Sequence, residues 1–301
     1  MSIVVNNLTK KFGVQRAVDN ISFEVKTGEI LGFLGPNGAG KTTTMKILTC
    51  YMAPSDGDAK INELSILDSQ DEIKRKIGYL PENNPLYPEM YVREYLGFVA
   101  SIYKINKKKV VDDIINATGL IPEQHKKIGA LSKGYRQRVG LAQALIHSPE
   151  ILILDEATTG LDPNQIVEIR NLIKDAGKEK TVMFSTHIMQ EVEAICNRII
   201  IIDKGSIVAD EAKSDIYSKI KKPRQYVVVE FDRDADENDL KKLPGVKSVK
   251  KLGDRTWGIE AEGETDIRPS VFSFAVSGKL TVLSMQKQET NLEDIFRQLT
   301  A

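Results

Sequence analysis

The segment Gly35–Thr42 reads Gly-Pro-Asn-Gly-Ala-Gly-Lys-Thr and constrains this 301-residue chain more than any other segment does. It fits the pattern G-x-x-x-x-G-K-[ST], in which glycines let the backbone wrap closely around an anion. Glu29–Leu34 before it reads as a buried strand, and Thr42–Thr49 after it has a helical pattern. Because a helix start adds the positive end of its dipole, the loop predicts a phosphate-binding site.

Within this loop, backbone and side chains share the binding of a polyphosphate. We expect Lys41 to neutralise the β- and γ-phosphates and the Thr42 hydroxyl to ligate Mg²⁺. The residues expected to contact the nucleotide here are Gly35, Pro36, Asn37, Gly38, Ala39, Gly40, Lys41, Thr42 and Thr43. A chance match is rare, roughly one in a hundred for a chain of this length when glycine makes up about 7% of residues.

A second motif, Ile151–Glu156, is an apolar strand that ends in two acids. Such unbroken apolar strands are buried on both faces of parallel sheets, and these sheets bind ligands at the carboxyl ends of their strands. We therefore predict that Asp155 holds Mg²⁺ and that Glu156 is the general base for an attacking water. The alternative, a buried strand that ends in two acids by chance, is disfavoured by the phosphate loop.

Strands and helices alternate through residues 1–217, which predicts an α/β domain with a largely parallel core sheet. A basic run at Lys107–Lys109 is expected as a solvated turn within the helical region Glu89–Thr118. The other expected elements are strands at Ile3–Val5, Ile21–Val25, Thr181–Ser185 and Ile199–Asp203, and a helix at Lys133–Ile146.

The basic, proline-containing segment 218–225 is expected to link this domain to a smaller one over residues 226–301. The order strand-helix-strand-strand-helix-strand in the tail matches the split βαβ, ferredoxin-like α+β unit. The elements are expected at Tyr226–Asp232, Asp236–Leu243, Val246–Leu252, Thr256–Ala261, Ile267–Val276 and Leu280–Gln286, followed by a last helix at Leu292–Leu299.

Composition limits the partners and the compartment. Basic and acidic residues both number 42, so the formal net charge is zero and nucleic acid is not expected as a partner. No signal peptide is visible, and apolar runs such as Ile199–Ile202 fall far short of the ~20 residues that span a bilayer. Cys50 and Cys196 are expected as buried free thiols. We therefore expect a cytoplasmic protein that needs another subunit for any work at a membrane.

A third motif, Leu131–Gln137, opens the helix before the acidic strand and resembles the L-S-G-G-Q signature of ATP-binding-cassette (ABC) ATPases. Ser132 and Gly134 match the signature, whereas Lys133 and Tyr135 replace its usual Gly and Gln. The resemblance implies that Ser132 and Gly134 contact the γ-phosphate of ATP held by a second subunit. A hydroxyl and free N–H groups at a helix start do form an anion site, but a plain helix cap at Ser132 is the alternative.

The same resemblance assigns further residues. Phe12 lies where the family places an aromatic residue to stack on adenine, with a core position as the alternative. Glu82 occupies the place of the Q-loop glutamine and can still ligate Mg²⁺. Asp162 ends the segment Gly160–Asp162, which resembles the D-loop at the dimer interface. His187 resembles the switch histidine that contacts the γ-phosphate, and so joins the general base as a catalytic residue.

Within the family, the chain resembles ATP-binding subunits of ABC-2-type exporters, including those associated with drug resistance and bacterial gliding motility. Lys133–Tyr135, Glu82 and the stretch Asn291–Phe296 carry this narrower match. It implies an ATPase that binds ATP and Mg²⁺, pairs with a second copy of itself or a similar ABC ATPase, and drives a transmembrane permease subunit for export from the inner face of the cell membrane. An ABC ATPase with no transport role, for example in cofactor assembly, is the alternative.

Overall fold

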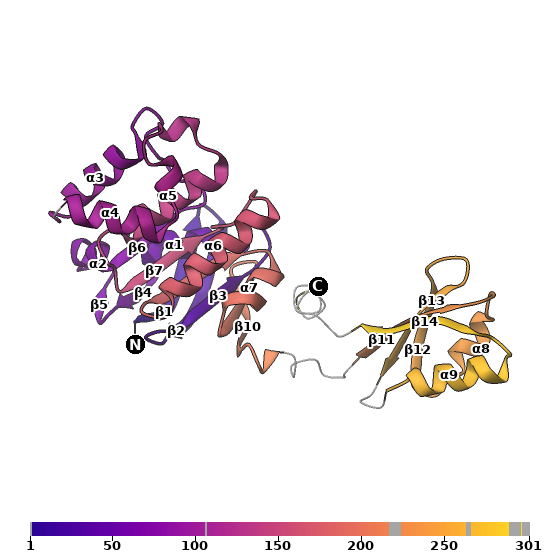
Figure 1. Cartoon of the computed structure of the whole chain (residues 1–301). Helices are drawn as coiled ribbons and strands as arrows, with labels where there is room; N and C mark the ends of the chain where they lie inside the picture. Colours follow the sequence, from indigo (N-terminus) through magenta and orange to yellow (C-terminus); the bar gives the residue numbers. More distant parts are fainter. Residues whose placement is uncertain (1, 106, 217–223, 263–265, 289–295, 297–301) are drawn as a thin grey trace. The chain divides into compact units, whose positions relative to one another are not determined.

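The structure is a computed structural model that describes residues 2–105, 107–216, 224–262, 266–288 and 296 (Figure 1). The chain divides between Lys213 and Ser214 into two compact units, which are described separately below. Most of the predicted linker 218–225 lies outside the described residues, so the boundaries 1–217 and 226–301 remain predictions.

A six-stranded sheet with the order β10-β9-β3-β8-β7-β6 forms the centre of the N-terminal unit. β3 runs parallel to β8 and β9, and β7 runs parallel to β6 and β8, while β10 is antiparallel to β9. Every residue of β3, β7 and β8 is buried, as expected for strands covered on both faces. The predicted α/β class with a largely parallel core is confirmed. The strands are β3 (Ile30–Leu34), β6 (Ile77–Leu80), β7 (Ile151–Asp155), β8 (Thr181–Thr186), β9 (Arg198–Asp203) and β10 (Ser206–Ala212).

A second, antiparallel sheet has the order β2-β1-β4-β5, and it shares one hydrophobic core with the six-stranded sheet. Helix α1 (Lys41–Leu48) contributes Met45, Ile47 and Leu48 to that core, together with residues from both sheets. Cys196 is buried and Cys50 is half-buried, and neither forms a disulfide. The strands are β1 (Ile3–Phe12), β2 (Gln15–Val25), β4 (Asp56–Ile61) and β5 (Leu64–Ser65).

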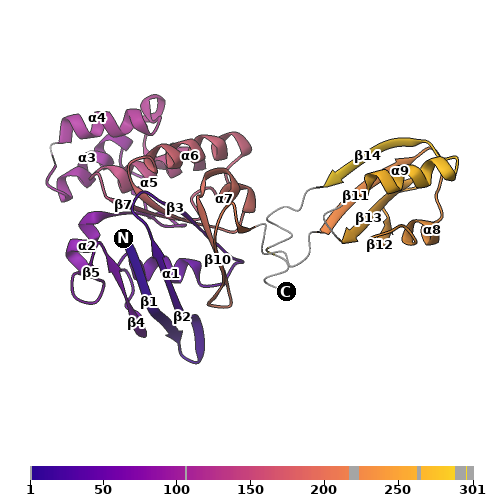
Figure 2. The same cartoon turned by 90° about the horizontal axis from the view of Figure 1, so that it is seen from below.

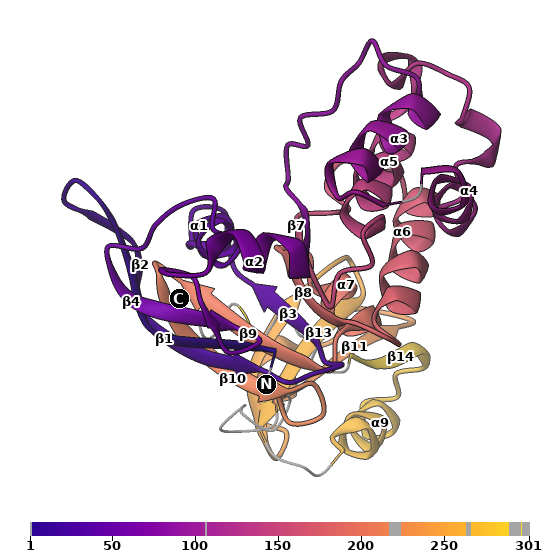
Figure 3. The same cartoon turned by 90° about the vertical axis from the view of Figure 1, so that its left-hand side faces the viewer.

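Helices α3 (Val92–Ile102), α4 (Lys107–Ala117) and α5 (Lys133–Leu145) form a lobe with its own hydrophobic cluster, beside the sheets in Figures 1 and 3. The turn expected at Lys107–Lys109 is wrong, because these residues begin α4. Val111 and Ile115, four residues apart, are both buried in the lobe, which holds the helix in place, while Lys108 and Lys109 in its first turn are exposed as expected.

The N-terminal unit also contains helices that the sequence reading did not name. They are α2 (Gln70–Lys76), α6 (Pro163–Ala176) and α7 (Met189–Ile195), with short 3₁₀ turns at Ile121–Glu123 and Ile128–Ala130. In the described parts of the chain, no helix has both the length and the apolar character that a bilayer crossing requires.

The C-terminal unit has a four-stranded antiparallel sheet with the order β12-β13-β11-β14 (Figure 2). Leu240 of α8 and Val271 of α9 share one hydrophobic cluster with inward side chains of the sheet, so both helices pack on the same face. The predicted βαββαβ order is confirmed. The helix expected at Leu292–Leu299 lies outside the described residues except for Phe296. The elements are β11 (Arg224–Phe231), α8 (Glu237–Lys241), β12 (Val246–Lys251), β13 (Thr256–Glu262), α9 (Arg268–Ser277) and β14 (Val282–Gln288).

Candidate active site

The phosphate loop joins the end of β3 to the start of α1, and its glycines are required by close contacts. Gly40 has φ +110°, and a Cβ atom there would lie 2.4 Å from the carbonyl oxygen of Ala17. A Cβ atom at Gly35 would lie 2.5 Å from the carbonyl oxygen of Ile202. Since neither backbone oxygen can move aside as a side chain would, the tight loop tolerates only glycine at these two positions.

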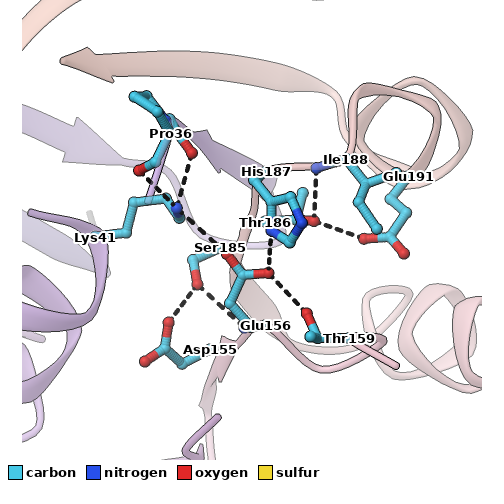
Figure 4. Close-up of polar contacts among 11 residues, drawn as sticks. Pro36, Lys41, Asp155, Glu156, Thr159, Ser185, Thr186, His187, Ile188 and Glu191 are labelled. Carbon is cyan, nitrogen blue, oxygen red and sulfur yellow. Dashed lines mark hydrogen bonds and ion pairs between the residues drawn. The ribbon is translucent and has the colours of Figure 1, made fainter. Parts of the chain in front are cut away.

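Lys41, the first residue of α1, folds back over the loop (Figure 4). Its Nζ donates to the carbonyl oxygens of Gly35 at 2.7 Å and Pro36 at 3.2 Å, and lies 3.3 Å from Oε1 of Glu156. The side chains of Lys41 and Glu156 are only 5% and 6% exposed. A buried cation of this kind persists because a carboxylate and two carbonyl groups compensate its desolvation.

Glu156 follows β7 in a strained conformation with φ +51°. Such a conformation in a residue other than glycine costs about 1–3 kcal/mol. Its backbone N–H donates to the carbonyl oxygen and the Oγ of Ser185, at 3.1 and 3.2 Å. Its Oε2 accepts a hydrogen bond from Thr159 Oγ1 at 2.9 Å and lies 2.8 Å from Nδ1 of His187 (Figure 4). A carboxylate oxygen accepts hydrogen bonds, so this contact is one in the tautomer that carries the imidazole proton on Nδ1.

Asp155, the last residue of β7, is fully buried. Its Oδ1 accepts a hydrogen bond from Ser185 Oγ at 2.5 Å, whereas its Oδ2 has no hydrogen-bond partner among the described residues. Burial raises the pKa of the Asp155 carboxyl, and the hydroxyls of Ser185 and Thr42 oppose that shift. A buried carboxylate oxygen without a donor is a group that a cation can satisfy.

Thr42, Glu82 and Asp155, the three residues predicted to ligate Mg²⁺, line one cavity of about 640 Å³. Among the described residues, no group of three or more His, Cys, Asp and Glu side chains is placed to hold a metal. The donors that the chain offers here are therefore two carboxylates and a hydroxyl. This set suits a hard cation that keeps water or phosphate oxygens as its other ligands.

Phe12 ends β1 and is 48% exposed, so the core position considered for it is wrong. The ammonium of Lys10 lies 5.5 Å from the centroid of its ring, which is a cation–π contact. The exposed ring is available to stack on a planar ligand.

The signature residues begin helix α5, in the helical lobe. Ser132 is exposed, and its Oγ accepts a hydrogen bond from the backbone N–H of Tyr135 at 3.3 Å, so it does cap the helix. Gly134 is buried, and a Cβ atom there would lie 2.5 Å from the side chain of Gln165. Asp162 is exposed and caps α6 by accepting from the N–H of Gln165 at 3.0 Å. These three predicted site residues do not line the cavity described above.

Sequence reasoning missed three residues at the site, namely Thr159, Ser185 and Tyr79. Ser185 lies near the carboxyl end of β8, beside that of β7, so the rule that ligands bind at strand ends could have found it. Tyr79 lines the same cavity with a buried hydroxyl that has no hydrogen-bond partner among the described residues. Thr159 stands in a turn after β7, and nothing in the sequence pattern marks it.

Comparison with known proteins assigns the family. The model of the ABC transporter family matches residues 18–159, and the model of the DrrA1-3-like ATP-binding protein C-terminal domain matches residues 214–300. The bacitracin transport ATP-binding protein BcrA of Bacillus licheniformis is 41% identical over 210 residues, which are 69% of each chain. The linearmycin resistance ATP-binding protein LnrL of Bacillus subtilis is 32% identical over 307 residues, 98% of this chain and 96% of that one. The chain belongs to the ABC transporter ATP-binding proteins.

Solved ABC structures share the fold of the N-terminal unit. A dimeric ATP-binding cassette in a post-hydrolysis state, bound to ADP and phosphate, is 28% identical with a TM-score of 0.64, over 70% of this chain and 98% of that one. CbiO1 of Clostridium perfringens, part of an ABC transporter complex, is 27% identical with a TM-score of 0.66, over 72% of this chain and 90% of that one. The predicted ABC ATPase is confirmed: this is an ATP-hydrolysing subunit of an ABC transporter.

Proposed function

We propose that this ABC ATPase powers export, and that Glu156 is the general base of its hydrolysis site. The supporting observation is the buried contact of one carboxylate with Lys41 on one oxygen and His187 on the other. In the structure, the Lys41 ammonium lies 3.3 Å from Oε1 of Glu156. When ATP occupies the loop, its phosphates attract that ammonium, and the carboxylate becomes free to accept the proton of the attacking water.

Thr42, Asp155 and Glu82 are the residues that we propose for Mg²⁺. The buried Asp155 Oδ2 and the Thr42 hydroxyl at the helix start fit an oxygen-ligated cation. When bound, Mg²⁺ supplies neutralisation of charge on the phosphate oxygens. The backbone N–H groups of residues 35–43 cradle the phosphates, and the exposed Phe12 ring stacks on adenine.

Ser132, Gly134 and Asp162 act, in our proposal, on the ATP held by a second subunit. Ser132 is exposed at the start of a 13-residue helix, so its hydroxyl and the neighbouring N–H groups can meet an anion from outside the chain. The dimeric state of the solved cassette that binds ADP and phosphate supports this arrangement. Two copies, or this chain and a similar ABC ATPase, then enclose two ATP molecules in an isologous pair.

The direction of transport and the membrane partner are inferred from relatives. Relatives named for bacitracin transport and linearmycin resistance, together with the DrrA1-3-like C-terminal domain, support export. We propose that residues 1–217 form the ATPase domain, that residues 226–301 form an accessory domain, and that the chain works in the cytoplasm on the inner face of the membrane with a transmembrane permease. Co-purification of a tagged chain with one membrane protein tests this proposal, and recovery of the chain alone from detergent-solubilised membranes contradicts it.

Glu156→Gln tests the role of the general base, because the amide keeps the shape of the side chain but cannot take the proton. Steady-state ATP turnover should fall by about 100-fold or more, while ATP binding, measured by equilibrium titration, is retained. Glu150→Gln is the matched control, since that exposed glutamate precedes the same strand and its side chain contacts Lys76 and Asn62, away from the phosphate loop. Unchanged turnover in Glu156→Gln would remove Glu156 as the base.

A further inference from the structure

The two oxygens of the Glu156 carboxylate have different surroundings. Oε2 contacts two hydrogen-bond donors, the Thr159 hydroxyl at 2.9 Å and His187 Nδ1 at 2.8 Å. Oε1 is buried without a hydrogen bond to any described residue, and the Lys41 ammonium lies 3.3 Å from it. One oxygen is therefore held in place, while the other faces the side chain that is expected to contact phosphate.

We propose that Thr159 is a positioning residue for hydrolysis: with His187 it holds Oε2 of Glu156, so that Oε1 is the atom that takes the proton of the attacking water. This inference rests on the proposed role of Glu156 as the base. Figure 4 shows the hydroxyl and the imidazole meeting the same end of the carboxylate, with Lys41 on the side of the other oxygen.

The lone pairs of Oε2 that point at Thr159 and His187 are engaged, and a proton arriving there would displace a donor. Oε1 loses only an ion pair, which breaks when Lys41 turns to phosphate. A glutamate carboxylate can rotate about its last side-chain bond, and the Thr159 hydroxyl is one of the two contacts that oppose this rotation. Two fixed donors on one oxygen thus orient the plane of the carboxylate as well as choosing its reactive atom.

The turn that carries Thr159 is itself ordered. Its backbone N–H donates to the carbonyl oxygen of Glu156 at 3.1 Å, and the N–H of Leu161 donates to the carbonyl oxygen of Thr158 at 3.2 Å. Asp162 then caps α6. Since the backbone on both sides is hydrogen-bonded, the Thr159 hydroxyl is held near the carboxylate. Little conformational entropy is therefore lost when it positions Glu156.

Hydrolysis moves the proton of the attacking water to Glu156 and the γ-phosphoryl group to the water oxygen. An O–H bond of the attacking water breaks and its proton moves to Oε1, while the water oxygen forms a bond to the γ-phosphorus. The bond from that phosphorus to the β–γ bridging oxygen breaks, and ADP leaves with the bonding electrons. The products are ADP, inorganic phosphate and a protonated Glu156, which returns its proton to solvent or phosphate.

The test compares Thr159→Val, Thr159→Ser and the control Thr158→Val in the full chain. Valine keeps the shape of threonine without the hydroxyl. Thr158 is the matched control because its buried Oγ1 has no hydrogen-bond partner among the described residues. We expect kcat at saturating ATP to fall about tenfold in Thr159→Val, with the ATP dissociation constant unchanged and Tm lowered by only a few degrees through loss of one hydrogen bond. Thr159→Ser and Thr158→Val should stay within about twofold of the parent chain.

A double-mutant cycle with Glu156→Gln separates positioning from a structural effect. If Thr159 acts through the carboxylate proton acceptor, Thr159→Val adds less than about twofold to the loss caused by Glu156→Gln. A full tenfold additional loss, or a tenfold loss in Thr159→Ser, would overturn the inference. Parental kcat in Thr159→Val would overturn it too, while leaving the base intact. Parental turnover in Glu156→Gln alone would instead refute the proposed function.

Discussion

The phosphate-loop region and the signature region differ in how complete they are within one chain. At the phosphate loop, Lys41 and Glu156 are almost fully buried and contact each other, and His187 and Thr159 complete the group. At the signature, Ser132 is exposed, and its hydroxyl caps its own helix. The first region is assembled before any ligand binds, whereas the second presents a helix start to solvent.

This difference indicates which part of the site needs a second chain. The catalytic group at the phosphate loop is formed within one chain. Its geometry is therefore already in place when ATP enters the loop. An exposed signature contributes only when another surface carries ATP to it. In the pair that we propose, ATP favours the closed state through its higher affinity for that state, and hydrolysis removes the preference.

Ser132→Arg tests whether the exposed signature takes part in hydrolysis, and it should have the largest effect of the changes considered. A bulky side chain at an exposed helix start leaves the fold intact, apart from the loss of a cap that contributes about 1 kcal/mol. We expect steady turnover to fall by about 100-fold, because the γ-phosphate site of a second chain is blocked, while each chain still binds ATP. Ser132→Asn, which keeps a cap, is the control for stability. An active Ser132→Arg chain would show that the exposed region takes no part in hydrolysis.

Glycine substitutions in the phosphate loop and in the signature should lower the free energy of unfolding by different amounts. Gly40→Ala places Cβ against the Ala17 carbonyl oxygen in a left-handed conformation, and should cost about 2–4 kcal/mol in chemical denaturation. Gly134→Ala meets only the end of the Gln165 side chain, which can rotate, and should cost about 1 kcal/mol. Adding Gln165→Ala to Gly134→Ala should recover most of that cost. Equal costs at the two glycines would remove this distinction.

Asp155→Asn should give the smallest effect, one that depends on pH. The pKa of Asp155 is higher in the folded chain than its ordinary value of 3.8, so the ionised form disfavours folding. That cost is absent below pH 3.8 and complete above the raised pKa. The uncharged variant should therefore have a Tm about 2–4 °C above that of the parent at pH 7 without nucleotide or metal, and the difference should shrink as the pH falls and vanish below pH 3.8. A difference that does not change with pH would contradict this reading.

Short sequence patterns predicted those parts of the fold and the site that are formed by residues close together in the chain. The phosphate loop, the acidic strand ending at Asp155 and the order of the C-terminal elements follow from glycine spacing, apolar runs and alternation. The start of α4 at Lys107 was missed, because burial of Val111 and Ile115 in the lobe outweighs the solvated appearance of the basic run. α6 was missed although Asp162 and Pro163 are helix-start signals.

Two site residues depend on geometry that the sequence pattern does not encode. Ser185 and Asp155 are 30 positions apart in the chain, and they meet because β7 and β8 are neighbours in the sheet. Thr159 lies only three positions after Glu156, but its hydroxyl reaches the carboxylate through the turn after β7, which no helix or strand pattern predicts. His187 was predicted by resemblance alone, and the structure brings its ring to the Glu156 carboxylate. Its catalytic role remains a proposal.

The most direct test of the central claim, that one chain's phosphate loop works with another chain's signature, is ATP turnover in a mixture of two variants. Lys41→Ala removes the loop function and Ser132→Arg removes the signature function, so each variant alone should be nearly inactive. A mixed pair has one composite site in which an intact loop faces an intact signature, and turnover should reappear on mixing. Full turnover by Ser132→Arg alone, or no turnover from a mixture shown to form mixed pairs, would contradict the claim.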